Sequence, residues 1–240
     1  MDSLLLAIIV TCFAACLQGV AGFGAGLISM GVLASVWSVP KATAIMLPLG
    51  VLLNVSLIIQ RRQTVELSSL KWVFIGLPLG VFFGVHLLEV VAEKTLKLLL
   101  GLALCASVVN TMINDRKHRE YGSFVAFIAG TFAGMSGSAF SASGPPILIY
   151  ANLQGWDRDL YRAQLSALFM TSSLLALIGL SIGGQVDVST LSISLSLTPG
   201  VLLGSLIGTH LGSSLPQSIF RYLVLGLLIA LSARFLFNSL

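Results

Sequence analysis

The sequence predicts an all-α, polytopic integral membrane protein built from two inverted repeats. Of its 240 residues, 56% are hydrophobic and only 9% are charged, compared with about 25% charged residues in ordinary soluble domains. Long apolar stretches recur along the chain, and two of them are interrupted by glycines or serines at corresponding places in the two halves. This composition excludes a soluble enzyme and a disordered chain. The net charge of +4 is too scattered to form a nucleic-acid-binding face.

Six apolar stretches are long enough to cross a bilayer as helices. They are residues 42–60, 72–88, 95–112, 163–180, 191–211 and 219–237. Four shorter stretches form two pairs, and a break rich in glycine or serine interrupts each pair. The first pair is 4–17 and 27–37, around the break at 19–26; the second is 123–135 and 146–153, around the break at 136–145. We therefore expect each repeat to contain one broken-helix, re-entrant-like pair and three full transmembrane helices.

The chain divides into a first repeat at 1–112, a hydrophilic cytoplasmic linker at 113–121 and a second repeat at 122–240. Several matches between the halves at one constant spacing indicate a duplication. They are Lys41 with Arg162, the segment 66–70 with 187–191, and Pro78 with Pro199. If each short pair enters and leaves on one side, most of the 13 basic residues lie inside, so the positive-inside rule favours inverted over parallel repeats. Two short full spans per pair would give the same sidedness.

Inverted repeats would bring the two breaks together near the middle of the membrane. A helix that starts after a break offers free N–H groups and the positive end of its dipole, which favour an anion. Glycine permits close backbone approach, and serine hydroxyls add donors. All nine acidic residues lie in hinges or at segment ends, which disfavours a cation as substrate. The alternative is that the glycines only permit tight helix packing.

These arguments select a set of candidate substrate-binding residues. They are Gly22, Phe23, Gly24 and Gly26 from the first break, Ser136, Gly137, Ser138, Ser141 and Ser143 from the second, and Lys41 and Arg162 at the starts of two long helices. Arg162 is the preferred charge partner of the anion, and Phe23 and Phe140 are candidates for an apolar wall. For Lys41 and Arg162 the alternative is a charge that snorkels to the membrane interface.

Other polar residues inside apolar stretches have two interpretations each. The amides Gln18, Asn54 and Gln164 either join helices or line a pore. His86 and His210 are either proton carriers or neutral, hydrogen-bonded interior residues. The sequence has neither a nucleotide-binding phosphate loop nor a cysteine pair with zinc spacing. We therefore expect secondary or facilitated transport without a cofactor or metal.

The motifs at the two breaks resemble those of the TauE/SafE sulfite exporter family of membrane permeases. The resemblance rests on Gly19-x-x-Gly22-Phe23-Gly24-x-Gly26, Gly134-x-Ser136-Gly137, Ser143-Gly144-Pro145-Pro146 and Tyr161-Arg162-Ala163, and it covers nearly the whole chain. It implies a multi-pass protein of the bacterial inner membrane that moves a sulfur-containing anion, such as sulfite, a sulfonate or sulfoacetate, usually outward. The oligomeric state stays open, with a homo-oligomer as one option.

The main alternative is a rhomboid-like intramembrane serine protease. Gly134-Met135-Ser136-Gly137 also fits the Gly-x-Ser-Gly motif of those enzymes, with Ser136 as nucleophile and His210 as base. Against this, the sequence has no Trp-Arg dipeptide, the matching glycine motif of the first half has no serine, and His86 repeats His210 without a nucleophile. A third reading, an assembly subunit without transport of its own, does not explain the polar breaks.

Overall fold

The computed structural model describes residues 2–61, 65–112, 122–154, 156, 158–212, 226 and 229–233, and its named elements are all α-helices. They are α1 (Asp2–Ala21), α2 (Ala25–Val36), α3 (Val39–Arg61), α4 (Leu67–Val90), α5 (Glu93–Met112), α6 (Ser123–Phe140), α7 (Gly144–Gln154), α8 (Arg158–Ile182) and α9 (Val188–Leu211). Among the described helices, six are long and apolar enough to cross a membrane: α1, α3, α4, α6, α8 and α9. The predicted helical membrane fold is confirmed.

The lengths predicted for two of the short stretches were wrong. The stretch 4–17 is part of α1, with 20 residues, and 123–135 is part of α6, with 18 residues; at ~1.5 Å per residue each is about 27–30 Å long. Both helices continue through glycines and serines that sequence reasoning assigned to the breaks, because small residues are well accommodated where membrane helices pack closely. Each broken pair therefore joins one full-length helix to one short helix, α2 or α7.

One of the three remaining predicted segments is a described helix, and the other two are not fully described. Helix α5 covers the predicted stretch 95–112. The predicted linker at 113–121 and most of the predicted span at 219–237 lie outside the described residues.

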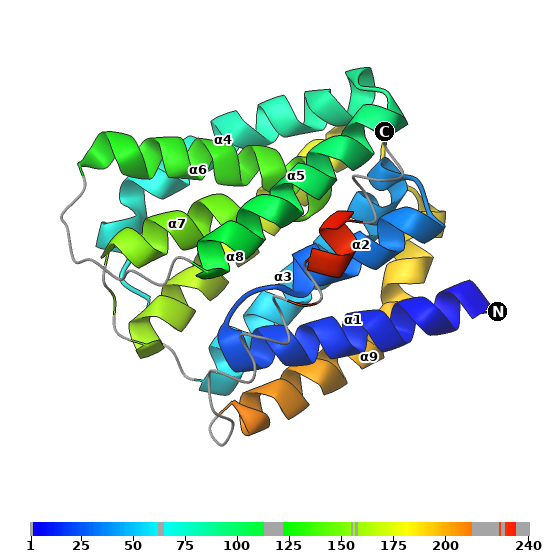
Figure 1. Cartoon of the computed structure of the whole chain (residues 1–240), viewed down its shortest axis with the longest axis horizontal. Coiled ribbons are helices and arrows are strands. Elements are labelled where there is room, and N and C mark those ends of the chain that lie inside the picture. Colours follow the sequence, from blue (N-terminus) through cyan, green and yellow to red (C-terminus); the bar gives the residue numbers. More distant parts are fainter. Residues whose placement is uncertain are drawn as a thin grey trace.

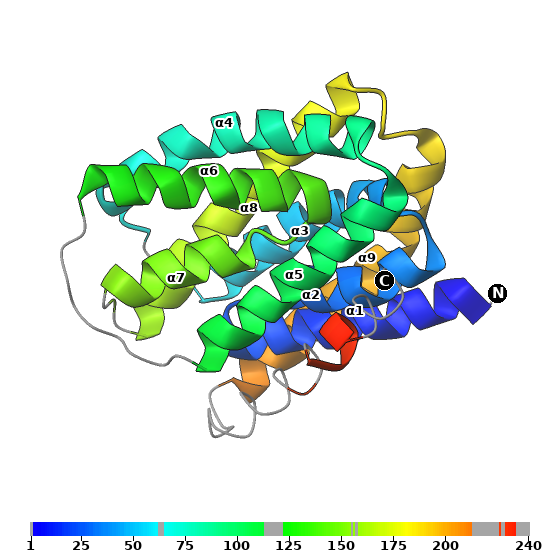
Figure 2. The same ribbon diagram turned by 45° about the horizontal axis from the view of Figure 1, so that its top comes forward.

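Two closely packed helix pairs form opposite sides of the molecule: α4 lies along α6, and α1 lies along α9 (Figures 1 and 2). Within each pair the backbones touch. A Cβ atom on Gly80 of α4 would overlap the carbonyl oxygen of Thr131 in α6, and one on Gly204 of α9 would overlap that of Cys12 in α1. Glycines thus allow van der Waals contact between backbones, which is a main source of helix association in lipid.

Helices α3 and α8 cross between these two pairs. Helix α3 packs on α8 and α9, while α8 packs also on α4 and α6. The two halves make matching contacts when α1, α2, α3 and α4 are taken to correspond to α6, α7, α8 and α9. The contact of α1 with α9 then matches that of α6 with α4, and the contact of α2 with α3 matches that of α7 with α8. In Figure 1, α1 runs from right to left and α6 from left to right. This pattern agrees with inverted repeats, which stay a prediction.

Helix α9 begins with a capping box. The carboxylate of Asp187 accepts a hydrogen bond of 2.7 Å from the backbone N–H of Thr190, and the Thr190 hydroxyl accepts one of 3.0 Å from the N–H of Asp187. The hydrogen bonds from the Thr190 backbone and side chain lower the pKa of the Asp187 carboxyl below its ordinary value. A charged cap of this kind stabilises the start of a helix at the end of a membrane span.

Candidate substrate site

The two breaks meet at one cavity in the interior. Its volume is about 40 Å³, and its lining includes Gly24 from the first break, Gly26 from the first turn of α2, and Ser141 and Ser143 from the second break. A Cβ atom on Gly26 would overlap the carbonyl oxygen of Ser141, so the two segments touch. Since one water molecule needs roughly 10–15 Å³, the cavity can hold a few water-sized groups, such as the oxygens of a small oxyanion.

Both breaks begin with a residue in the left-handed conformation. Gly22 follows α1 with φ 91°, and Ser141 follows α6 with φ 49°. A left-handed residue directly after the last helical turn is a common way to end a helix. The second break is therefore confined to residues 141–143, shorter than the predicted 136–145.

Helix α2 starts at the cavity with a positive end that its own side chains do not cap. Its N-cap residue is Gly24, with φ 111°. The N–H of Ala25 donates to Oε1 of Gln18 at 3.1 Å, and the N–H of Ile28 donates to the carbonyl of Gly24 at 3.0 Å. The N–H groups of Gly26 and Leu27 have no partner among the described residues. Two open donors and the dipole of α2 therefore border the cavity.

Helix α7 offers fewer amides, because Pro145 and Pro146 stand in its first turn and lack an N–H. The second break contributes hydroxyl groups instead. The Oγ of Ser143 lies 2.8 Å from the Oγ of Ser172 on α8. The two breaks thus bring different donors to one cavity.

Five polar residues of the cavity lining were not among the predicted site residues: Thr11, Gln18, Ser29, Asn54 and Ser173. Gln18 of α1 and Asn54 of α3 are 4% and 3% exposed, and Nε2 of Gln18 donates to Oδ1 of Asn54 at 2.9 Å. Ser29 of α2 is 1% exposed, and its hydroxyl has no hydrogen-bond partner among the described residues. A buried hydroxyl without a partner is costly, so Ser29 is a candidate ligand for a bound polar group.

Several predicted residues do not line the cavity. Ser136 and Ser138 lie within α6, where their hydroxyls donate to the carbonyls of Phe132 and Gly134 at 2.9 and 2.8 Å. Gly137 lies behind the cavity wall, since a Cβ atom there would overlap the hydroxyls of Ser143 and Ser172. Of the remaining residues in this group, Gly22 lies in the first break. Phe23 packs against a buried apolar cluster that includes Leu70 and Leu165, and Phe140 is itself buried in a separate cluster with Leu27 and Ile45.

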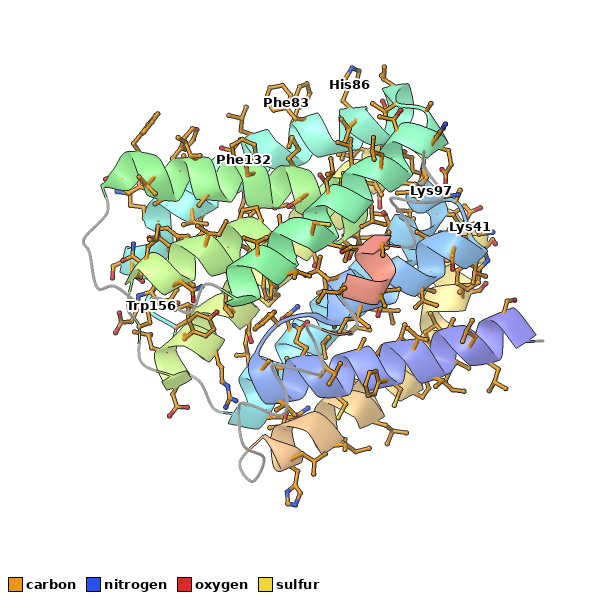
Figure 3. The ribbon with its side chains drawn as sticks, viewed as in Figure 1. Lys41, Phe83, His86, Lys97, Phe132 and Trp156 are labelled. Atoms are coloured by element: carbon orange, nitrogen blue, oxygen red, sulfur yellow. The ribbon has the colours of Figure 1, made fainter. Side chains whose placement is uncertain are left out.

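The two predicted basic residues lie beside helix ends, outside the cavity lining. The guanidinium of Arg162 on α8 donates through Nη2 to the carbonyl of Val20, in the last turn of α1. Lys41 lies at the start of α3, at the end of the molecule that also carries Lys97 (Figure 3). Near it in α3, the hydroxyl of Thr43 donates to the carbonyl of Ala139, in the last turn of α6, at 3.0 Å. Helices α8 and α3 thus satisfy a terminal carbonyl just before each break.

The family model described as sulfite exporter TauE/SafE matches residues 7–235. The chain belongs to the sulfite exporter TauE/SafE family. The probable sulfite/organosulfonate exporter TauE of Cupriavidus necator is 25% identical over 222 residues, which cover 90% of this chain and 87% of that relative. No solved structure matches the chain.

Membership of the TauE/SafE family makes the chain a transporter and not an enzyme. With its apolar helices and a bacterial exporter as a relative, it is a multi-pass protein of the bacterial inner membrane. Among the described residues, no group of three or more His, Cys, Asp or Glu side chains gathers around a potential metal site.

The structure also gives no support to a protease centred on Ser136. The Ser136 hydroxyl is engaged within α6, which packs on α4, α7 and α8, whereas α9, the helix of His210, packs on α1 and α3. His86 projects outward from α4 (Figure 3), with its side chain 69% exposed and Nδ1 3.8 Å from a carboxylate oxygen of Glu89. Neither histidine lines the cavity.

Proposed function

We propose that this TauE/SafE protein exports a small sulfur-containing anion, sulfite or an organosulfonate such as sulfoacetate, from the cell. The cavity at the meeting point of the two breaks is the observation that carries this proposal. The open N–H groups of Gly26 and Leu27 and the unpartnered hydroxyl of Ser29 suit the oxygens of a sulfite or sulfonate group. The name of the Cupriavidus relative supports the same substrate class.

The charge balance of the site also favours an anion. The described residues that line the cavity are apolar, glycine, hydroxyl or amide residues. Hydrogen bonds from neutral donors to an anion are roughly twice as strong as those between neutral groups. The positive end of the α2 dipole adds to this preference, and the apolar side chains of Leu49, Phe169 and Val201 can contact the carbon portion of a sulfonate.

Export is proposed to occur by alternating access between inverted repeats at 1–112 and 122–240, joined by a cytoplasmic linker at 113–121. The helix contacts refine which parts would move. Because α1 packs on α9 and α4 packs on α6, each tight pair combines helices of both halves. We propose that the moving bodies are these mixed bundles, one around α1, α3 and α9 and the other around α4, α6 and α8, with the cavity between them.

The proposal is tested by measuring the thermal stability of the purified protein with sulfite, sulfate, sulfoacetate, taurine, isethionate and acetate. A ligand that binds only the folded protein raises the melting temperature, by an amount that corresponds to about 2.7 kcal/mol at 100 times its Kd. We expect a rise with sulfite or a sulfonate and none with acetate, followed by flux of the same anion in proteoliposomes. No stabilisation by any sulfur anion, together with no flux, would contradict the proposed function.

Arg162 is proposed to strengthen anion binding through its charge, because it lies beside the first break, where a low dielectric extends the reach of a charge. We expect Arg162→Ala to raise the half-saturating anion concentration by about tenfold, which is ~1.4 kcal/mol, and Arg162→Lys to retain most of the affinity. Both variants should lower the melting temperature, since both disturb the bond to Val20. Near-normal affinity in Arg162→Ala would leave Arg162 with the helix-capping role alone. Lys41→Ala, which removes the basic residue at the start of α3, is the comparison variant.

A further inference from the structure

The side chain of Gln18 joins three helices across the first break. Its Oε1 accepts from the N–H of Ala25, the first residue of α2, at 3.1 Å, while its Nε2 donates to Oδ1 of Asn54 on α3 at 2.9 Å. Gln18 itself belongs to the last turn of α1, and its backbone carbonyl accepts from the N–H of Gly22 at 2.7 Å. One buried carboxamide therefore spans the interruption between α1 and α2 and ties both to α3.

The direction of each hydrogen bond in this chain of amides is fixed by its ends. Nδ2 of Asn54 donates to the backbone carbonyl of Gly50 at 2.7 Å, and a carbonyl can only accept. Oδ1 of Asn54 must therefore face Gln18 and accept from its Nε2. That leaves Oε1 of Gln18 to accept from the N–H of Ala25, which can only donate. Reversing either amide would place two donors or two acceptors against each other.

Oε1 of Gln18 occupies the position at the start of α2 that an anion's oxygen would prefer. The next two amides of α2, those of Gly26 and Leu27, are open, and the hydroxyl of Ser29 in the same cavity is buried without a partner. A hydrogen bond to a charged group is stronger than one between two neutral groups. An anion can therefore replace the amide oxygen of Gln18, whereas a neutral ligand gains nothing by the exchange.

We propose that Gln18 is a displaceable cap of α2 and selects anions over neutral ligands. The anion takes the N–H of Ala25 in place of Oε1 and binds the open amides of Gly26 and Leu27 and the hydroxyl of Ser29. The displacement releases the link that Gln18 makes between α1 and α2, so binding loosens the first break. This inference rests on the proposed function and adds the residue that competes with the substrate.

Two substitutions separate a competing cap from a substrate ligand. Gln18→Glu keeps the size of the side chain but places a carboxylate oxygen, which the substrate cannot easily displace, at the N–H of Ala25. Gln18→Ala removes the competitor. We expect Gln18→Glu to raise the half-saturating concentration of isethionate at least about tenfold; this is measured at pH 9, because burial at position 18 raises the pKa of a carboxyl. Gln18→Ala should lower the melting temperature without ligand, yet leave that concentration unchanged or reduced.

The matched control is Gln185→Ala in the turn between α8 and α9, where the half-buried amide donates to Glu89 at 3.4 Å, away from the cavity; this variant should leave the half-saturating concentration unchanged. A raised half-saturating concentration in Gln18→Ala would overturn the proposal, because Gln18 would then be a ligand of the anion or a support for its site. Undiminished binding by Gln18→Glu would overturn it as well. The wild-type protein is measured first with isethionate and with sulfite. If no sulfur anion stabilises it and none is transported, the proposed function itself fails, and the role of Gln18 fails with it.

Discussion

Replacing Gly26 with alanine is expected to abolish anion export and to lower thermal stability. The new Cβ atom would overlap the carbonyl oxygen of Ser141 and lie 3.2 Å from its carbonyl carbon, both of which are backbone atoms. Ser141 has little room to retreat, because its left-handed conformation and the hydrogen bond from Ala142 to Ser136 hold the end of α6. Overpacking of this kind costs about 1–3 kcal/mol, and the backbone shift would fall on the cavity itself.

Export is measured as anion flux from proteoliposomes, and stability as the melting temperature in detergent. Gly122→Ala is the control, since a Cβ atom there meets no atom within 4 Å. Gly144→Ala is a graded comparison within the same cavity: its Cβ atom would lie 3.3 Å from Cδ1 of Leu27, the end of a flexible side chain, and its effect should be smaller. Wild-type flux in Gly26→Ala would show that the two breaks are not in contact during transport.

The fold was largely predictable, because the membrane dictates long apolar helices that the sequence displays directly. The ends of the helices were less predictable. Propensities learned from soluble helices suggested that α1 would stop before Gly19 and α6 before Ser136, whereas packing against α9 and α4 keeps both segments helical. The left-handed residues that do end these helices, Gly22 and Ser141, lie a few residues further along.

The residues of the candidate site were predictable only where they belong to one of the two glycine- or serine-rich motifs. Gly24, Gly26, Ser141 and Ser143 belong to these motifs, and the structure brings them to one cavity. Which residues bind the substrate stays a prediction.

The rest of the lining comes from helices far apart in sequence. Gln18, Asn54 and Ser29 lie on α1, α3 and α2, and a single sequence does not show which faces of these helices meet. Ser29 carried no signal at all, because a lone serine in an apolar helix is ordinary; its unpartnered hydroxyl became evident only in three dimensions.

Replacing Gly80 with alanine is expected to prevent most of the protein from reaching its folded state. The Cβ atom would overlap the carbonyl oxygen of Thr131 and lie 2.7 Å from its carbonyl carbon and 2.8 Å from the backbone nitrogen of Met135. Rotation of a side chain cannot relieve contacts with backbone atoms, so α4 and α6 would have to separate along their length. Lipid supplies no hydrophobic force to keep them together, and the loss of packing should reach or exceed the ~1–3 kcal/mol typical of overpacked cores.

The matched control is Gly179→Ala on α8, which also faces α4. Its Cβ atom would lie 3.0 Å from Cγ2 of Val85 and 3.3 Å from Cγ1 of Val81, so side chains rather than backbone would adjust. We expect Gly80→Ala to lose most of the monodisperse protein on size-exclusion chromatography and Gly179→Ala to retain it with a lower melting temperature. Equal yields and melting temperatures for the two variants would contradict direct backbone contact between α4 and α6. The same reasoning extends to Gly204→Ala, because α9 meets α1 through the corresponding kind of contact with the carbonyl of Cys12.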